Sequence, residues 1–200
     1  MNLSHDPDEY VCESSSLRSA SDVQPALRSA SDVGLRSRQA VRGRTGEQFV
    51  AYTVSLQHVE PRPIAAVRAQ IPIRDVPSRF REYLDQVYAA AKTGAISLDG
   101  QNIFVYHATQ PNLMEIEFGV GAKASFAPVG RVEYRQVPGG NVATTTHWGD
   151  YALLGPAHQA VVDWCKTEGL TLAGISWEVY GHWSDDPSKR RTDIYQLLRV

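Results

Sequence analysis

Three features that would narrow the class of protein are scarce in this sequence of 200 residues. It has only two cysteines, Cys12 and Cys165, which lie far apart, so we do not expect a disulfide framework. No apolar run approaches the roughly 20 residues that span a bilayer. The formal net charge is −2 and the pI is about 6.3, which excludes the general basic footprint of a nucleic-acid-binding protein.

The beginning of the sequence also lacks the apolar core of a secretory signal, because Met1 to Tyr10 are mainly polar and acidic. Together with the low cysteine content, this favours a cytoplasmic protein. What the chain does have is 42% hydrophobic residues, enough for a packed core. Its length allows one ordinary domain, alone or with a tail.

Residues 1–46 form the predicted tail. They contain almost no aromatic residues and many Ser, Arg and Asp, so they cannot bury enough surface to offset the entropy of ordering, and we expect them to be disordered. Residues 17–23 recur as residues 27–33, a duplication too short for a structural repeat. The later arginines allow a weak nucleic-acid arm, but we favour a solvated linker. The tail is too short to hold a helix-turn-helix domain.

Residues 47–200 predict two rounds of strand, strand, helix, strand, strand. Apolar stripes at helical spacing predict one helix from Val76 to about Gly94 and another from about Leu153 to Thr167. Alternating, β-branched and aromatic runs predict the eight strands, at 49–56, 64–71, 102–108, 113–120, 131–137, 142–148, 175–180 and 192–200.

One such half is small for a stable core, so we expect the two halves to join. The prediction is an α+β fold: a tandem pseudo-repeat with joined antiparallel sheets, two helices on one face and a ligand cleft between the halves. We place this cleft on the sheet face opposite the helices, since ligand sites favour such seams.

The residues from Gly174 to Gly181 carry the main candidate site. On this strand Ser176, Glu178 and Tyr180 point to one side, because successive side chains alternate. In an apolar cleft, an ionised Glu178 would hold a lipophilic cation, or it would act as a general base that activates water, with Tyr180 as a hydrogen-bond donor. The alternatives are a solvent-exposed Glu178 and ordinary packing of Tyr180.

Aromatic residues are the candidate walls of this cleft. Trp148 and Tyr151 flank a predicted turn, and Trp183 follows the Glu178 strand as a possible lid. Phe104 and Tyr106 share one strand face, which we expect toward the cleft, with the aliphatic residues of that strand under the helix. For each aromatic residue, core or rim packing is an equally good interpretation.

Two further carboxylates, Glu115 and Glu117, share a strand face. One of them, with Glu117 as the candidate ligand-binding residue, would be a pseudo-symmetric partner of Glu178 across the groove, although a solvated edge is the favoured interpretation. The six histidines have no zinc-ligand spacing, and phosphate-binding loops and nucleophile elbows are missing. Ser176 has no base close in sequence. We therefore expect no metal and no cofactor.

Several short motifs together resemble a known family. They are Pro-Gly-Gly-Asn-Val-Ala at 138–143, His-Trp-Gly-Asp-Tyr at 147–151, Trp164, Trp-Glu-Val-Tyr at 177–180 and Thr-Asp-Ile-Tyr at 192–195, with first-half motifs at 100–106 and 114–120. Over about residues 48–200 the chain resembles the GyrI-like family, the effector-binding domain of AraC-type and MerR-type multidrug-sensing regulators. Asp150 departs from the family, which more often has Pro there.

This resemblance implies a tandem two-half fold with a cleft, and a buried Glu at position 178 that contacts cationic or aromatic ligands. It also implies a stand-alone member, because the tail holds no DNA-binding domain. Some stand-alone members hydrolyse cyclopropane-bearing DNA alkylators.

Three functions remain open. The first is binding of lipophilic, aromatic or cationic small molecules for toxin or drug sensing, sequestration or detoxification. The second is hydrolysis of strained cyclopropane-type alkylators, with Glu178 and Tyr180 as catalytic residues. The third is a gyrase-inhibitor-like protein-interaction module. We expect a small-molecule ligand, no membrane or direct nucleic-acid partner, and a monomer.

Overall fold

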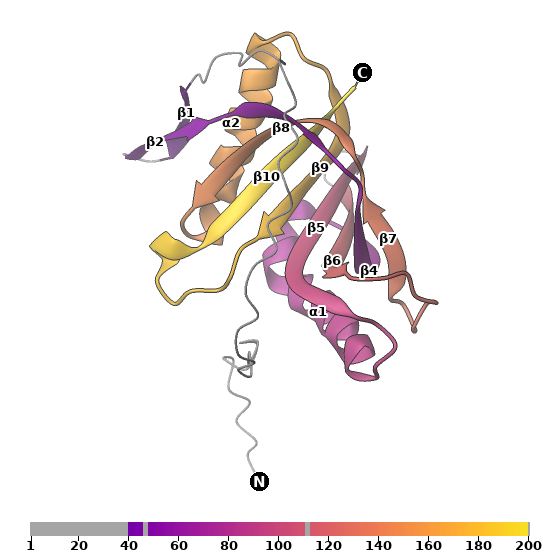
Figure 1. Cartoon of the computed structure of the whole chain (residues 1–200). Coiled ribbons are helices and arrows are strands. Elements are labelled where there is room, and N and C mark those ends of the chain that lie inside the picture. The colour runs from indigo at the N-terminus through magenta and orange to yellow at the C-terminus, as the bar shows by residue number, and fades with distance from the viewer. Residues whose placement is uncertain (1–39, 46–47, 111–112, 200) are drawn as a thin grey trace, which may run out of the picture. The chain divides into compact units, whose positions relative to one another are not determined.

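The computed structural model describes residues 40–45, 48–110 and 113–199 (Figure 1). The predicted order of strand, strand, helix, strand, strand is confirmed in the second half, whereas the first half has three strands before its helix because two strands replace the one predicted at 49–56. The first half contains β2 (Gln48–Thr53), β3 (Ser55–Val59), β4 (Arg62–Ile71), α1 (Val76–Lys92), β5 (Leu98–Gln110) and β6 (Leu113–Ala122). The second half contains β7 (Glu133–Val137), β8 (Gly140–Trp148), α2 (Leu154–Thr167), β9 (Leu172–Tyr180) and β10 (Arg191–Leu198). Short 3-10 helices are η1 (Ile73–Asp75), η2 (Tyr151–Leu153) and η3 (Pro187–Lys189).

One further strand, β1 (Ala40–Thr45), lies in the segment that we predicted to be disordered, so the prediction is wrong for these six residues. β1 pairs antiparallel with β2 in a two-stranded sheet. The partner strand satisfies backbone donors and acceptors that the local composition alone does not stabilise. The remainder of the predicted tail, residues 1–39 and residue 46, lies outside the described residues.

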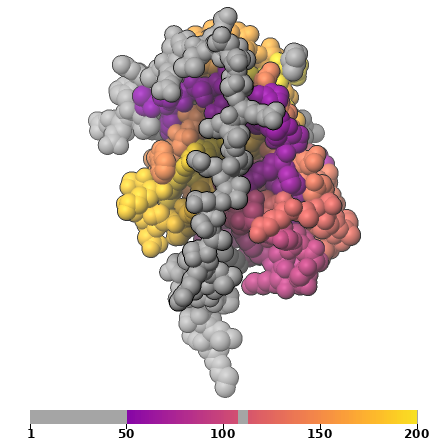
Figure 2. Space-filling model, viewed as in Figure 1, coloured from indigo at the N-terminus to yellow at the C-terminus, as the bar shows by residue number. Residues whose placement is uncertain are grey.

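The main sheet is antiparallel and has eight strands in the order β3-β8-β10-β9-β5-β6-β4-β7. The two halves join where β5 pairs with β9, which confirms the predicted joined sheet. The order is symmetric about this central pair, and each half contributes its first main-sheet strand to the other half: β3 pairs with β8, and β7 pairs with β4. In the space-filling view, β10 (yellow) and α1 (magenta) both reach the surface on the side shown and lie apart (Figure 2).

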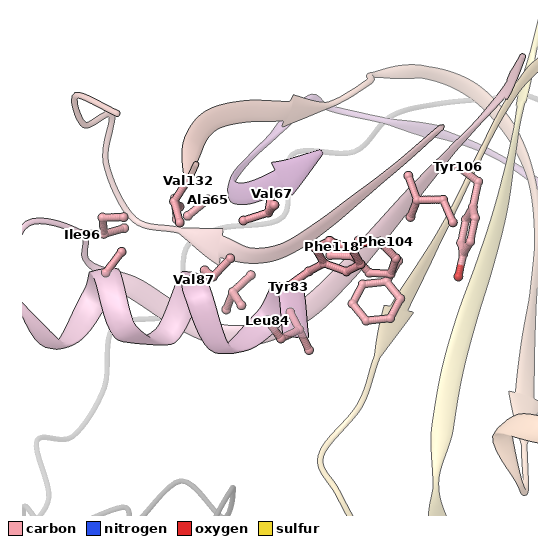
Figure 3. Packing of buried hydrophobic residues seen from close by; sticks show 14 of the residues in the cluster. Ala65, Val67, Tyr83, Leu84, Val87, Ile96, Phe104, Tyr106, Phe118 and Val132 are labelled. Atoms are coloured by element: carbon pink, nitrogen blue, oxygen red, sulfur yellow. The ribbon is translucent and has the colours of Figure 1, made fainter. Parts of the chain in front are cut away.

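The two helices cover one face of this sheet. α1 begins with a proline in its first turn and buries Tyr83, Leu84 and Val87. These side chains pack against Phe104 of β5 and Phe118 of β6, as Figure 3 shows. α2 buries an equivalent stripe against β8 and β10, formed by Ala157, Val161, Trp164 and Cys165. No helix in the described part of the chain has the length and apolarity needed to cross a membrane.

The opposite face of the sheet carries a second buried cluster that consists of strand residues only. Ile103 and Val105 of β5 pack there with Trp177 of β9. Our expectation that the aliphatic residues of β5 lie under a helix is therefore wrong, because Phe104 and Tyr106 occupy the helix face. Along the β5–β9 seam, this opposite face is a packed core and not the groove that we predicted.

Candidate functional site

Glu178 lies in the middle of β9, directly opposite Phe104 of β5 on one side and Ile194 of β10 on the other. Directly paired residues of neighbouring strands share a sheet face, so Glu178 is on the helix face, with apolar neighbours on both sides. Only 4% of its surface is exposed. The alternation of the strand puts Tyr180 on the same face, as predicted from the sequence.

Three side chains hydrogen-bond to the Glu178 carboxylate. The Tyr106 hydroxyl donates to Oε2 at 2.6 Å, and the Tyr180 hydroxyl donates to the same oxygen. His158 Nε2 lies 2.8 Å from Oε1. Since an ionised carboxylate has no hydrogen to give, the imidazole is the donor in this contact. Both oxygens of a buried charged group are thus satisfied, which is the condition for burying a charge without a prohibitive cost.

These partners keep the carboxylate ionised. Burial by itself raises the pKa of Glu178, but the hydrogen bond and charge of His158, with the hydrogen bonds from Tyr106 and Tyr180, hold it below its ordinary value. Burial and the charge of Glu178 raise the pKa values of both tyrosine hydroxyls well above their ordinary range. At neutral pH the carboxylate of Glu178 is therefore ionised, and it is held by two neutral phenols and by the imidazole ring of His158.

His158 is the member of this cluster that our sequence analysis did not single out. It is the fifth residue of α2, and its ring meets Tyr106 edge-on, with 6.4 Å between centroids. Its side chain is 25% exposed, so it covers Glu178 from the solvent side. The sequence does contain a signal, because position 158 falls within the apolar stripe of the helix. A polar residue on a buried stripe indicates a buried partner.

A series of aromatic contacts leads from Glu178 to the surface. Phe104 packs on Tyr180 with ring centroids 4.9 Å apart, and Tyr180 meets Tyr151 of η2 at 5.4 Å. Tyr151 is in turn 6.2 Å from Trp183, which is 56% exposed. The Arg190 guanidinium lies 4.1 Å from the centroid of the Trp183 ring. The structure therefore brings five of the predicted aromatic residues into one group beside the carboxylate: Phe104, Tyr106, Tyr151, Tyr180 and, at its outer end, Trp183.

Two predicted residues lie elsewhere. Trp148 is 59% exposed at the end of β8, opposite Arg191 and on the sheet face away from Glu178. Glu117 is paired with Val105 on that same far face, where it is buried 3.3 Å from His107. Neither residue is placed to contact a ligand held by Glu178.

The counterpart of Glu178 in the first half is Phe104, not Glu115 or Glu117. The two residues face one another across the central strand pair, and the next residues outward are Ile194 on one side and Phe118 on the other. The helices obey the same symmetry: Phe80 is the fifth residue of α1, as His158 is of α2, and Phe80 packs on Phe104. The His158–Glu178 pair in the second half thus corresponds to the aromatic pair Phe80–Phe104 in the first half.

Two pockets on the described surface lie away from this cluster. One, of about 210 Å³, is lined by hydroxyl-bearing residues of β8 and neighbouring strands, and the other lies beside α1. Glu178 itself is enclosed by its own partners. Among the described residues, no group of three or more His, Cys, Asp or Glu side chains is arranged to hold a metal ion.

Comparison with known proteins identifies the same region. The sequence profile of the GyrI-like small molecule binding domain matches residues 52–199, which include every member of the Glu178 cluster. Among curated proteins, none matches the chain in sequence.

Several solved structures share the fold. The C-terminal domain of EcmrR is 19% identical with a TM-score of 0.59, and the alignment covers 74% of this chain and 98% of that one. EcmrR in its DNA complex is 18% identical with a TM-score of 0.63, over 74% of this chain but only 57% of EcmrR. SAV2435 bound to tetraphenylphosphonium is 9% identical with a TM-score of 0.55, over 73% and 93% of the two chains. A hydrolase from Listeria innocua is 13% identical with a TM-score of 0.51, over 73% and 91%.

Proposed function

The chain belongs to the GyrI-like small molecule binding domain family, and from this premise we propose that it binds aromatic or lipophilic organic cations at Glu178. Such binding would serve to sense or sequester toxic compounds. Small-molecule binding is the property of the family, whereas the class of ligand is inferred from the residues of the site.

The buried, ionised carboxylate of Glu178 is the observation that supports this ligand class. A charge taken out of water attracts an opposite charge much more strongly than a surface carboxylate does. The rings of Phe104, Tyr180 and Tyr151 beside it would add cation–π attraction of about 0.5–2 kcal/mol per contact. An anion or a neutral polar molecule would gain neither term.

The relatives agree with this proposal without deciding it. SAV2435 was solved with tetraphenylphosphonium, a lipophilic cation of the kind that we propose. EcmrR was solved on DNA, but this chain matches only its effector domain and 57% of its full length. For the present chain we therefore propose ligand binding alone.

Hydrolysis, the alternative suggested by the Listeria innocua protein, is less well supported by the site. A general base needs a free oxygen facing a water molecule and a pKa near the working pH. Oε2 of Glu178 already accepts two hydrogen bonds and Oε1 accepts one, and the pKa of this group lies below its ordinary value, away from the working pH of a base. The same geometry that suits holding a cation makes Glu178 a weak base.

The test is titration calorimetry with tetraphenylphosphonium on the wild type and on Glu178→Gln. We expect binding in the wild type and a loss of at least about tenfold in the variant, because the attractive charge is removed. Glu117→Gln is the matched control, since it neutralises another buried carboxylate that hydrogen-bonds to a histidine, on the far face of the sheet. It should bind like the wild type. Equal binding by wild type and Glu178→Gln would overturn the proposal.

Mass spectrometry of the recovered compound separates binding from turnover. Tetraphenylphosphonium and a cyclopropane-bearing alkylator would be incubated with the wild type in parallel. Recovery of both compounds unchanged supports a binding protein. An alkylator product heavier by one water, formed by the wild type and not by Glu178→Gln, would make the protein a hydrolase.

A further inference from the structure

We infer that the imidazole N–H of His158 occupies the place that a cationic N–H group of the ligand takes on binding. The site therefore selects aromatic cations that carry an N–H donor over quaternary ones. This inference rests on the proposed function and names the ligand class more narrowly. It assigns His158 as the residue that determines specificity.

The two carboxylate oxygens of Glu178 accept hydrogen bonds from different parts of the structure. Oε2 accepts from Tyr106 and Tyr180, which lie on the two paired central strands of the sheet. Oε1 accepts from His158, whose ring projects from a helix and is partly exposed. Of the three donors, His158 is thus the one that lies on a helix, and its side chain is 25% exposed, so its ring has room to turn toward solvent. If His158 rotates away, Oε1 is freed while Oε2 keeps both tyrosine donors.

The pseudo-symmetry of the domain supports a functional reason for this imidazole. In the first half, the equivalent position holds Phe80, which packs on Phe104 and fills the space with carbon. A buried polar pair is poor evidence of a contribution to stability, because apolar residues of similar size pack as well or better. The second half therefore carries His158 and Glu178 where an aromatic pair suffices for folding.

The ligand class follows from what remains after His158 moves away. Oε1 would then be a buried, charged acceptor with no hydrogen bond, which is costly. A protonated amine or amidinium brings an N–H group that restores this bond together with the positive charge. A trimethylammonium or phosphonium group supplies only the charge, so it should bind more weakly.

The experiment compares two probes that share one aromatic body: (biphenyl-4-yl)methylammonium and its N,N,N-trimethyl derivative, titrated by calorimetry. We expect the wild type to bind the primary ammonium about tenfold more tightly, in line with one charge-assisted hydrogen bond. His158→Ala should bind the primary ammonium several-fold more tightly than the wild type, because no internal bond has to be broken first. His158→Leu, which fills more of the space, gives the same expectation if the alanine variant does not fold.

The matched control is His107→Ala, which removes the histidine partner of Glu117 on the far face of the sheet and should change neither affinity. Equal wild-type affinity for the two probes, or unchanged or weaker binding of the primary ammonium by both His158 variants, would overturn the inference. If one of these outcomes were found while Glu178→Gln lost binding, the inference about His158 would fail and the proposed function would still hold. If neither probe bound, or if Glu178→Gln bound like the wild type, the proposed function would fail as well.

Discussion

The hydroxyls of Tyr106 and Tyr180 come from opposite halves of the domain and donate to the same oxygen, Oε2 of Glu178. The two tyrosines occupy equivalent positions, each two residues beyond the Phe104–Glu178 pair on its own strand. The pseudo-twofold symmetry of the sheet therefore provides two equivalent donors, whereas only one half provides the carboxylate. This asymmetry gives one charged site in a nearly symmetric scaffold.

A first prediction concerns this shared oxygen. Tyr106→Phe or Tyr180→Phe alone should lower the free energy of unfolding by about 1 kcal/mol, because one donor remains on Oε2. The double variant leaves the oxygen without a donor and should lose about 1–2 kcal/mol more than the sum of the single changes. Urea unfolding of the four proteins measures this coupling. Strict additivity would mean that the two hydroxyls do not share one acceptor.

Local sequence patterns predicted most of the fold. Alternation and helical stripes gave both helices, the strand order along the chain and the antiparallel joined sheet. They did not reveal the exchange of β3 and β7 between the halves, because strand partners far apart in sequence leave no local pattern. β1 was missed for a related reason: it depends on its pairing with β2 more than on its own composition.

The candidate site was predictable only in part. Alternation correctly grouped Glu178 with Tyr180, and Phe104 with Tyr106. It could not say which group faces the helices, because both faces of β5 and β9 are buried and both look apolar in the sequence. Glu117 was predicted as a pseudo-symmetric partner of Glu178, but it is paired with Val105 on the far face of the sheet. His158 was missed because its contact with Glu178 joins a helix to a strand 20 residues away.

A second prediction concerns acid. Because the folded state holds the pKa of Glu178 below its ordinary value of 4.5, the ionised group contributes stability that is fully present above about pH 4.5. That contribution is lost as the pH falls through the lower folded value. The advantage of the wild type over Glu178→Gln in free energy of unfolding should therefore shrink as the pH falls below 4.5. Urea unfolding at a series of pH values checks this, and an advantage that grows toward low pH would contradict it.

A third prediction concerns two buried threonines. In the described part of the chain, the fully buried Thr192 hydroxyl has no hydrogen-bond partner, whereas the Thr145 hydroxyl donates to the backbone oxygen of Thr53 at 2.9 Å. Thr192→Val removes an unpaired buried polar group and should leave the protein unchanged or more stable, by up to about 1 kcal/mol. Thr145→Val, its matched control, should cost about 1 kcal/mol or more. Thermal unfolding of both variants tests the difference, and a larger loss for Thr192→Val would show that its hydroxyl has a partner.

A fourth prediction concerns Cys165, which lies almost fully buried on the inner stripe of α2. Burial raises the pKa of its thiol to about 11, so at pH 8 very little reactive thiolate is present and reagents reach the sulfur only when the helix opens. In a Cys12→Ser background, which leaves Cys165 as the single thiol, 5,5′-dithiobis(2-nitrobenzoate) should react slowly with the native protein and at once in urea. Native labelling as fast as labelling in urea would mean that α2 does not shield the thiol.

Because a bound ligand stabilises only the folded state, a saturating cation should slow the native reaction further. Glu178→Gln should lose that protection, which would link the reactivity of Cys165 on α2 to occupation of the carboxylate beneath the same helix.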